Sequence, residues 1–219
     1  MRWEIIIDRI PILLQGALMT VELTVLAVGI GTVIGLFTSL FRISKFGLSR
    51  FLAATYIDFF RGTPLLAQIY LIYFGLPQLV GYVPNPWISG VAALSINSGA
   101  YIAEIFRAGI QSIDKGQMEA SRSLGMSYGQ AMRYVILPQA FKRIVPPLGN
   151  EFIAMLKDSS LVSVITLQEL MLTGRTIVGS TYRPFEVYIT VAVLYLVMTL
   201  SISRLIAFLE RRLRTGDLH

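Results

Sequence analysis

The segment that decides the fold of this chain reads EASRSLGMSYGQAMRYVILP over residues 119–138. It is polar and charged, whereas the stretches on either side of it are apolar enough to span a lipid bilayer. A polar segment between two membrane spans lies at the membrane surface, where another protein can reach it. The segment therefore predicts a docking element on one face of an integral membrane protein.

The composition supports a membrane protein. Hydrophobic residues make up 54% of the 219 residues and charged residues make up 15%, against about a quarter in soluble domains. A helix needs about 20 predominantly apolar residues to cross the hydrocarbon core, and several windows of the chain reach that length. We therefore expect an all-α protein that crosses the cell membrane several times and has only a small soluble part.

Hydropathy predicts five membrane-spanning helices. They cover approximately residues 11–41, 51–80, 87–108, 140–165 and 185–209. Gly62 and Pro64 lie inside the second, and a proline pair at 146–147 is expected to interrupt the fourth, because proline lacks a backbone donor. In the first helix, Gly31 and Gly35 are spaced for close contact with a neighbouring helix.

The distribution of Lys and Arg orients these helices. If the N-terminus is outside, the outer segments contain only Arg2, Arg9, Arg175 and Arg183, and most other cations fall in inner segments. Because Lys and Arg are retained on the cytoplasmic side, this bias predicts an outer N-terminus, a cytoplasmic C-terminus and a cytoplasmic loop at about 110–138. Membrane topology thus explains the net charge of +6 better than nucleic-acid binding does.

The cytoplasmic loop carries signals for two short helices joined by a glycine turn. Asp114 and Gln117 match an N-cap with its capping-box partner. Gly125 is a natural C′ residue, because only glycine adopts the left-handed conformation without a Cβ penalty. Ser127 and Gln130 match a second capping box.

The second of these helices is expected to reach Leu137, after which Pro138 fits the first turn of a new helix or a kink. Small side chains at Ala120 and Ser121 would let another surface approach closely. On these features alone, an ordinary solvated loop between two spans is an equal alternative to a docking element.

The spacing of the loop resembles the EAA signature of ABC-importer permeases, which reads approximately EAA, three residues, Gly, nine residues, Ile, one residue, Leu-Pro. Here Ser121 replaces the second Ala and Val135 replaces Ile, and neither change removes a charge or a turn residue. Residues 61–68 (RGTPLLAQ) and 73–77 (YFGLP) resemble the second-helix signature of the polar amino acid permeases, and residues 161–170 also resemble that family. The resemblance extends over nearly all of the chain from Gln15 onwards.

This resemblance implies that residues 1–219 form a single permease domain on the five-helix core of the type I ABC importers. It implies a second permease beside it, either an identical copy or a homologue, together with two cytoplasmic ABC ATPase subunits and an outer substrate-binding protein. The residues carried over as the contact with the ATPase are Glu119, Ala120, Ser121 and Gly125. ATP and Mg would be bound by the ATPase, and no cofactor is expected in this chain.

A substrate site is predicted near the middle of the membrane. Counting about 1.5 Å per residue along each helix places Asn97 roughly 15 Å deep and Glu151 roughly 12 Å deep from the opposite side. Gln68 falls in the central or outer half of its helix, so the three side chains could meet at one depth. A carboxylate inside hydrocarbon costs about 2.5–3.5 kcal/mol, so Glu151 should face a cavity or a partner. It also follows the proline pair, and interrupted helices are typical of transporter sites.

Two roles fit Glu151. It could receive the ammonium or side-chain cation of an amino acid, with hydrogen bonds from Asn97, Gln68 and Asn150. Alternatively, it could pair with a buried cation such as Arg61 or Lys157 and hold the bundle together.

Asp158 lies about two helical turns beyond Glu151 and so faces nearly the same way. It is expected to act as a gate or in a packing ion pair, with direct substrate contact as the alternative. Together the two carboxylates favour a basic amino acid such as arginine, lysine or histidine. Glutamine remains open, because an α-ammonium suits Glu151 equally well.

Several chemistries are not predicted. The chain lacks a G-x-x-x-x-G-K-[ST] phosphate loop, so ATP hydrolysis is expected in a partner, and no catalytic constellation predicts enzymatic activity in this polypeptide. It has no cysteine and its lone histidine is His219, so no metal site is expected. The chief alternative is a secondary transporter, which would need an internal ion relay and often has inverted repeats; the sequence has no convincing repeat.

Overall fold

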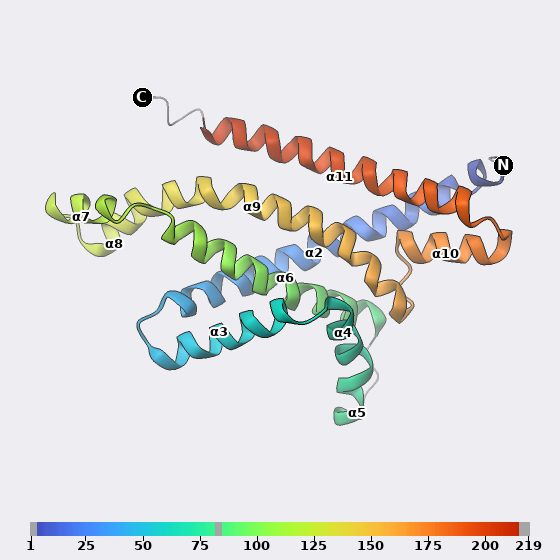
Figure 1. The fold of residues 1–219 in the computed structure, drawn as a ribbon, viewed down its shortest axis with the longest axis horizontal. Helices are drawn as coiled ribbons and strands as arrows, with labels where there is room; N and C mark the ends of the chain where they lie inside the picture. The colour runs from blue at the N-terminus through green and yellow to red at the C-terminus, as the bar shows by residue number, and fades with distance from the viewer. Residues whose placement is uncertain (1–3, 82–84, 215–219) are drawn as a thin grey trace.

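The computed structural model describes residues 4–81 and 85–214, and the regular secondary structure in these two ranges is helical. In chain order the α-helices are α1 Glu4–Ile7, α2 Ile10–Ile43, α3 Gly47–Gly62, α4 Leu65–Tyr70, α5 Leu76–Val80, α6 Pro86–Gln111, α7 Lys115–Ser123, α8 Tyr128–Ala131, α9 Leu137–Asp158, α10 Leu170–Thr181 and α11 Pro184–Arg214. Two π-helical segments, Leu71–Gly75 and Met132–Ile136, and one 3₁₀ segment, Ser159–Ile165, connect some of them. The expected all-α fold is confirmed. The long helices lie along one axis, with α7 and α8 at one end and α10 at the other (Figure 1).

Three of the described helices, α2, α6 and α11, are each long and apolar enough to cross a membrane. Two bent pairs pass the same test if each counts as one span: α3 with Leu65–Val80, bent by 107°, and Tyr128–Ile165 with α10, bent by 51°. The described residues thus hold three to five candidate spans, and the predicted total of five is the upper limit. α10 lies outside the predicted helices, because its 12 residues are too few to span a bilayer alone.

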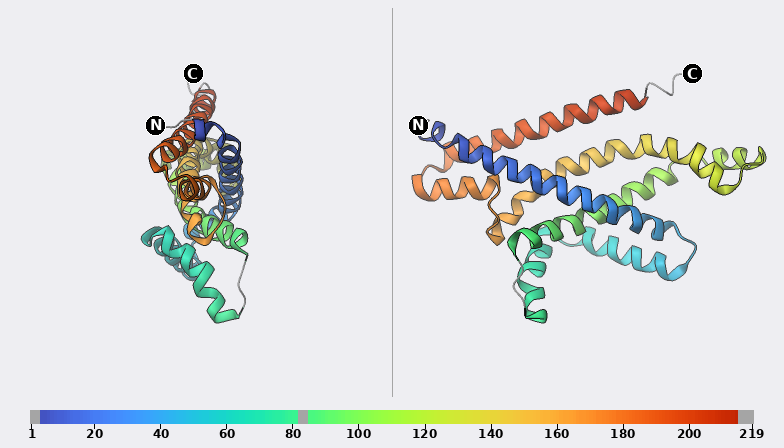
Figure 2. Two further views of the ribbon diagram at one scale, coloured as in Figure 1. Left: turned by 90° about the vertical axis from the view of Figure 1, so that its right-hand side faces the viewer. Right: turned by 180° about the vertical axis from the view of Figure 1, so that it is seen from behind.

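The second predicted helix breaks at Thr63 and Pro64. α3 ends at Gly62, both following residues are extended, and α4 begins at Leu65. Proline disfavours a helical conformation in the residue before it, which accounts for the extended Thr63. α4 consequently leaves α3 at a steep angle, and the arm formed by α4 and α5 projects from the bundle at its α5 end (Figure 2).

The fourth predicted helix is not interrupted at the proline pair 146–147, so that expectation was wrong. α9 runs through both prolines, although each removes a backbone donor and costs about 3 kcal/mol in a helix interior. Close packing on two sides holds the helix. A Cβ on Gly149 would lie only 2.6 Å from Ile206 of α11. On the other side, a Cβ on Gly109 of α6 would lie 2.2 Å from Ile144.

α2 and α6 approach each other through glycines. A Cβ on Gly31 would lie 3.0 Å from Ser98 Cβ. A Cβ on Gly35 would lie 2.8 Å from Ile102 Cγ2. The predicted close contact of these two glycines is therefore confirmed, with α6 as the partner helix. Such contacts matter in lipid, where close packing rather than the hydrophobic effect drives helix association.

An apolar core lies between α2, α4, α6 and α9. Its buried members include Leu23, Ile69, Leu94 and Met155, one from each of these helices. The polar residues expected to bind substrate lie on α4, α6 and α9, and this core holds those helices in register.

The loop between α6 and α9 has the predicted helix–glycine–helix shape. Asp114 Oδ1 accepts a hydrogen bond from the Gly116 backbone at 2.7 Å, which confirms the N-cap. Gly125 has a φ of +86° and ends α7 in the left-handed conformation. Ser127 and Gln130 form the predicted reciprocal capping box.

Two details of this loop differ from the prediction. The side-chain oxygen of Gln117 accepts a hydrogen bond from Gln139 Nε2 at 3.4 Å, so this side chain reaches across to α9. α8 passes through the π-helical segment Met132–Ile136 directly into α9, whereas a helix reaching Leu137 was expected before a new one. Pro138 does lie in the first turn of α9, one of the two positions expected for it. The wider π turn accommodates a residue that has no backbone donor.

Candidate functional site

Two side-chain amides close the break in the second span. Gln68 Nε2 of α4 donates to the carbonyl oxygens of Phe60 and Thr63 at 2.9 and 3.1 Å. Asn97 Nδ2 of α6 donates to Gln68 Oε1 at 2.9 Å and to the Phe60 carbonyl oxygen at 3.2 Å. These donors satisfy carbonyl groups that are freed where α3 ends. Inside a membrane such groups must be satisfied by the protein, because no bulk water is present.

The structure therefore brings Gln68 and Asn97 together from two helices. Both side chains are buried, and their donor groups are engaged within the protein. This arrangement gives them a structural function, which is to hold α4 at its steep angle to α3. Their expected contact with substrate stays a prediction.

Glu151 of α9 contacts α6 at the residue that follows Asn97. It is 9% exposed, and its Oε1 accepts a hydrogen bond from Ser98 Oγ at 3.0 Å. Ser98 follows Asn97 directly on α6, so the three side chains share one level of the bundle. Among the described residues no ion pair reaches Glu151, so the alternative of a structural pair with Arg61 is not what the structure contains. Ser98 was not among the residues predicted from the sequence. Its one signal there was its position next to Asn97.

The other two residues predicted to bind substrate, Asn150 and Asp158, are exposed at the surface of this chain. Asp158 is the last residue of α9 and lies within electrostatic reach of Glu151. In the described part of the chain, no cluster of three or more His, Cys, Asp or Glu side chains is arranged to hold a metal ion.

A groove of about 430 Å³ runs along α6 on one side of Glu151. It is lined by Arg61, Tyr101, Glu104, Ile105, Ala108, Gly109, Ser112, Arg143 and Pro147. Tyr101 follows Ser98 by three residues on α6. Pro147 precedes Glu151 by four residues on α9. The groove therefore begins about one helical turn from the Ser98–Glu151 hydrogen bond and runs toward the end of α6 that carries α7.

A second buried carboxylate, Glu169, was not identified from the sequence. It is 0% exposed and caps α10, accepting hydrogen bonds from the backbone of Met171 at 2.8 Å and of Leu172 at 2.7 Å. Tyr195 of α11 donates to the same carboxylate at 2.9 Å, and the Thr20 hydroxyl of α2 lies beside it. Its sequence signal was an acidic residue directly before a short apolar helix. Glu169 ties three helices together at the α10 end of the molecule.

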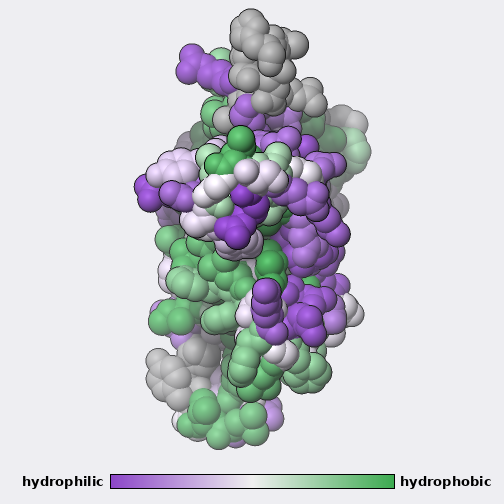
Figure 3. Space-filling model, turned by 90° about the vertical axis from the view of Figure 1, so that its left-hand side faces the viewer, coloured by the Kyte–Doolittle hydropathy of each residue, from purple (hydrophilic) through white to green (hydrophobic). Residues whose placement is uncertain are grey.

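The residues expected to contact an ATPase lie at the opposite end. Glu119, Ala120 and Gly125 are exposed, whereas Ser121 is 5% exposed and its hydroxyl donates to the Gln117 carbonyl oxygen. Figure 3 faces this end and shows hydrophilic residues gathered on it, with hydrophobic residues on the flank beneath. Three of the four residues are therefore accessible to a partner, and Ser121 packs the loop from inside.

Comparison with known proteins places this arrangement in a family. Residues 10–215 match the model of the binding-protein-dependent transport system inner membrane component. The arginine transport system permease protein ArtQ of Bacillus subtilis is 41% identical over 96% of both chains. The glutamine transport system permease protein GlnP of Escherichia coli is 42% identical over 97% of both chains.

Solved structures agree with this placement. A crystal structure of an amino acid ABC transporter with histidines matches with a TM-score of 0.91 and 51% identity, over 94% of this chain and 96% of that one. The methionine ABC transporter MetNI, in an inward-facing conformation, matches with a TM-score of 0.76 at 22% identity, which supports the fold alone. The chain therefore belongs to the family of inner membrane components of binding-protein-dependent transport systems and is a multi-pass permease subunit of an ABC importer, rather than a secondary transporter.

Proposed function

We propose that this chain lines half of the translocation pathway of an importer for polar amino acids, with basic amino acids as its preferred substrates. The observation that carries the proposal is Glu151, a buried carboxylate with a hydroxyl donor and, among the described residues, no ion-pair partner. Burying an unpaired charge is costly, so such a group is retained where a cation arrives from outside the chain. The ammonium or side-chain cation of an amino acid is that cation.

Asp158 supports a basic rather than a neutral substrate. It lies within electrostatic reach of Glu151 and is exposed on the chain. A substrate with a second positive charge gains from both carboxylates, whereas glutamine gains mainly from one. Relatives named for arginine and for glutamine are 41% and 42% identical, so they favour neither substrate. Glutamine is the second candidate, and Asn150 would serve its amide, because the donor groups of Gln68 and Asn97 are engaged within the protein.

Thermal unfolding of the purified transporter against a panel of amino acids tests this proposal. We expect basic amino acids to raise the unfolding temperature more than glutamine does, and Glu151→Gln to abolish the shift. Glu22→Gln, which changes an exposed carboxylate on α2, serves as the matched control and should keep the shift. Wild-type shifts in the Glu151→Gln transporter would contradict a substrate role for this residue.

The energy for transport comes from a separate ATPase that docks on the loop at about 110–138. The exposure of Glu119, Ala120 and Gly125 at one end of the molecule supports this role. ATP and Mg are bound by that partner, and this polypeptide itself performs no catalysis. The α7–α8 end is then cytoplasmic, with the C-terminus on the same side and the N-terminus outside.

A second permease, identical or homologous, completes the pathway, and an outer substrate-binding protein supplies it. The exposed apolar side chains of Leu71, Phe74 and Leu79 on the α4–α5 arm support a protein partner there. Because the chain has no cysteine, Leu79→Cys offers one site for crosslinking. A crosslinked pair of this chain indicates a homodimer, and a crosslink to another permease indicates a heterodimer.

A further inference from the structure

Arg61 has no hydrogen-bonding partner in the part of the chain that the structure describes. It lies at the end of α3, about 21 Å along the helix from Gly47, and its side chain is exposed to the groove beside α6. Within the described residues no hydrogen bond or ion pair involves its guanidinium. An arginine at membrane depth is expensive unless it faces a partner or a water-filled cavity.

Tyr101 holds this guanidinium in place. The guanidinium carbon of Arg61 lies 5.2 Å from the centroid of the Tyr101 ring, a cation–π contact. The contact is an attraction between the positive charge and the ring, and no hydrogen bond to another described residue uses the N–H donors of Arg61. The contact therefore orients Arg61 without saturating it.

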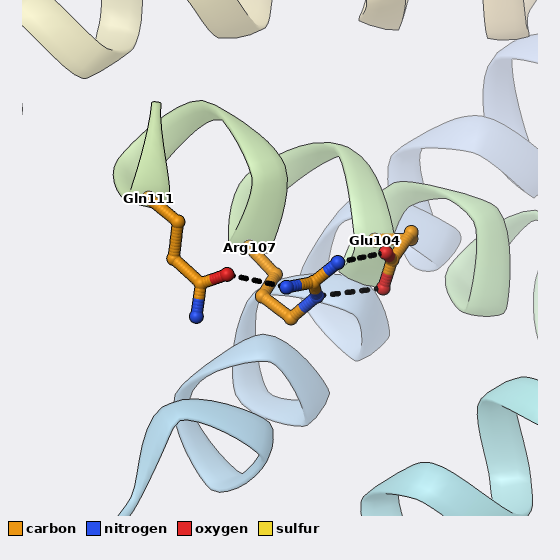
Figure 4. A network of polar contacts seen from close by, with 3 residues as sticks. All are labelled: Glu104, Arg107 and Gln111. Carbon is orange, nitrogen blue, oxygen red and sulfur yellow. Dashed lines mark hydrogen bonds and ion pairs between the residues drawn. The ribbon is translucent and has the colours of Figure 1, made fainter. Parts of the chain in front are cut away.

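The acidic residue nearest along the groove is already engaged. Glu104 accepts hydrogen bonds from both Nε and Nη2 of Arg107, and Arg107 Nη1 donates in turn to Gln111 (Figure 4). Because this bidentate pair largely satisfies the Glu104 carboxylate, the charge of Arg61 remains available. The groove lining also contains Arg143, so its free charge is positive.

Arg61 lies close to the proposed cation site. Tyr101, on which it stacks, is one helical turn from Ser98, and Ser98 donates to Glu151. Arg61 is also within electrostatic reach of Glu151. The Arg61 guanidinium and the Glu151 carboxylate are thus each in contact with α6, at residues about one turn apart. A positive and a negative group beside the same stretch of a helix match the two charges of a zwitterion.

We propose that Arg61 binds the α-carboxylate of the transported amino acid, stacked on Tyr101, while Glu151 binds a cationic group of the same molecule. The planar guanidinium offers paired N–H donors that fit a carboxylate in bidentate fashion, which lysine cannot reproduce. The inference rests on the proposed function, amino acid transport. It assigns the residue that recognises the carboxylate of the substrate. It makes the free carboxylate, rather than the side chain alone, a requirement for binding.

Calorimetry on the purified permease–ATPase complex tests this assignment. The ligands are a basic amino acid and its α-carboxamide, in which a neutral amide replaces the carboxylate. Wild-type complex should bind the amino acid about 10- to 100-fold more tightly than the carboxamide, the range for a hydrogen bond to a charged group. Arg61→Gln should reduce that ratio to near one, because it weakens binding of the amino acid and leaves binding of the carboxamide unchanged.

Controls separate recognition from a structural effect. Arg50→Gln removes an exposed arginine from the same helix and should preserve the ratio. Glu151→Gln should weaken both ligands together. If Arg61→Gln lowers the affinity for both ligands equally, or for neither, the carboxylate assignment is wrong. The proposal of amino acid transport is not affected by that result. If wild-type complex binds no amino acid, the proposed function itself fails. Should Arg61→Gln not fold, Arg61→Lys and Tyr101→Leu report the same ratio, and both should lower it.

Discussion

Asn97 of α6 donates a hydrogen bond to Gln68 of α4 at 2.9 Å, across the point where the second span breaks. The same amide of Asn97 also reaches the Phe60 carbonyl oxygen at the end of α3. A break in a membrane helix exposes carbonyl groups, and this pair of side chains satisfies them from within the protein. The break thus depends on two residues that lie on different helices.

Replacing Asn97 tests this dependence. Asn97→Leu leaves the Gln68 side-chain oxygen without its donor, and losing a partner of a buried polar group costs about 1–3 kcal/mol. We expect a clear fall in the thermal unfolding temperature of the detergent-solubilised permease. Asn150→Leu makes the same exchange at an exposed position and should have little effect. Equal destabilisation by both changes would argue against a structural role for the amide pair.

The contact of α2 with α6 predicts a difference between two glycines of one helix. Gly35→Ala places a Cβ 2.8 Å from Ile102 Cγ2 and 2.9 Å from the Ala103 backbone nitrogen, and overpacking of this kind costs about 1–3 kcal/mol. Gly29→Ala meets nothing within 4 Å and should be neutral or slightly stabilising. The measurement is the unfolding temperature of each variant. A tolerated Gly35→Ala would contradict the close approach of the two helices.

The left-handed turn after α7 predicts a defect in energy coupling. Gly125 has a φ of +86°, where a Cβ costs about 1–2 kcal/mol, so Gly125→Ala should distort the turn next to the exposed Glu119 and Ala120. We expect ATP hydrolysis by the reconstituted transporter to continue while amino acid uptake falls several-fold. Gly129→Ala lies in the neighbouring α8 with open space around it and should transport normally. Normal uptake in Gly125→Ala would remove support for docking at this loop.

Glu169 predicts an anchor at the other end of the molecule. Glu169→Gln puts an amide group where the carboxylate accepts hydrogen bonds from Met171, Leu172 and Tyr195. Because a buried network with one mismatched member loses several bonds at once, we expect destabilisation of about 2–3 kcal/mol. Tyr195→Phe removes a single donor and should cost less, about 1 kcal/mol. If Tyr195→Phe lowers the unfolding temperature more than Glu169→Gln does, the carboxylate is not the centre of the network.

The predictions from sequence succeeded where the signal was local. Asp114, Gly125 and the Ser127–Gln130 box were all recognisable, because a cap depends on residues within about one helical turn of it. The proline pair at 146–147 misled for the opposite reason. Its local penalty is real, but packing of α9 against α6 and α11 outweighs it, and those contacts come from distant parts of the chain.

The sequence by itself determined the all-α membrane architecture, the capped helices of the loop and the presence of a carboxylate at position 151, because hydropathy and backbone preference act over short windows. Only the tertiary structure decided the partners. Gln68 meets Asn97 across 29 residues, and Glu151 meets Ser98 across 53. Such pairings depend on how whole helices pack, and helix packing is a sum over many contacts that no single window of the sequence contains.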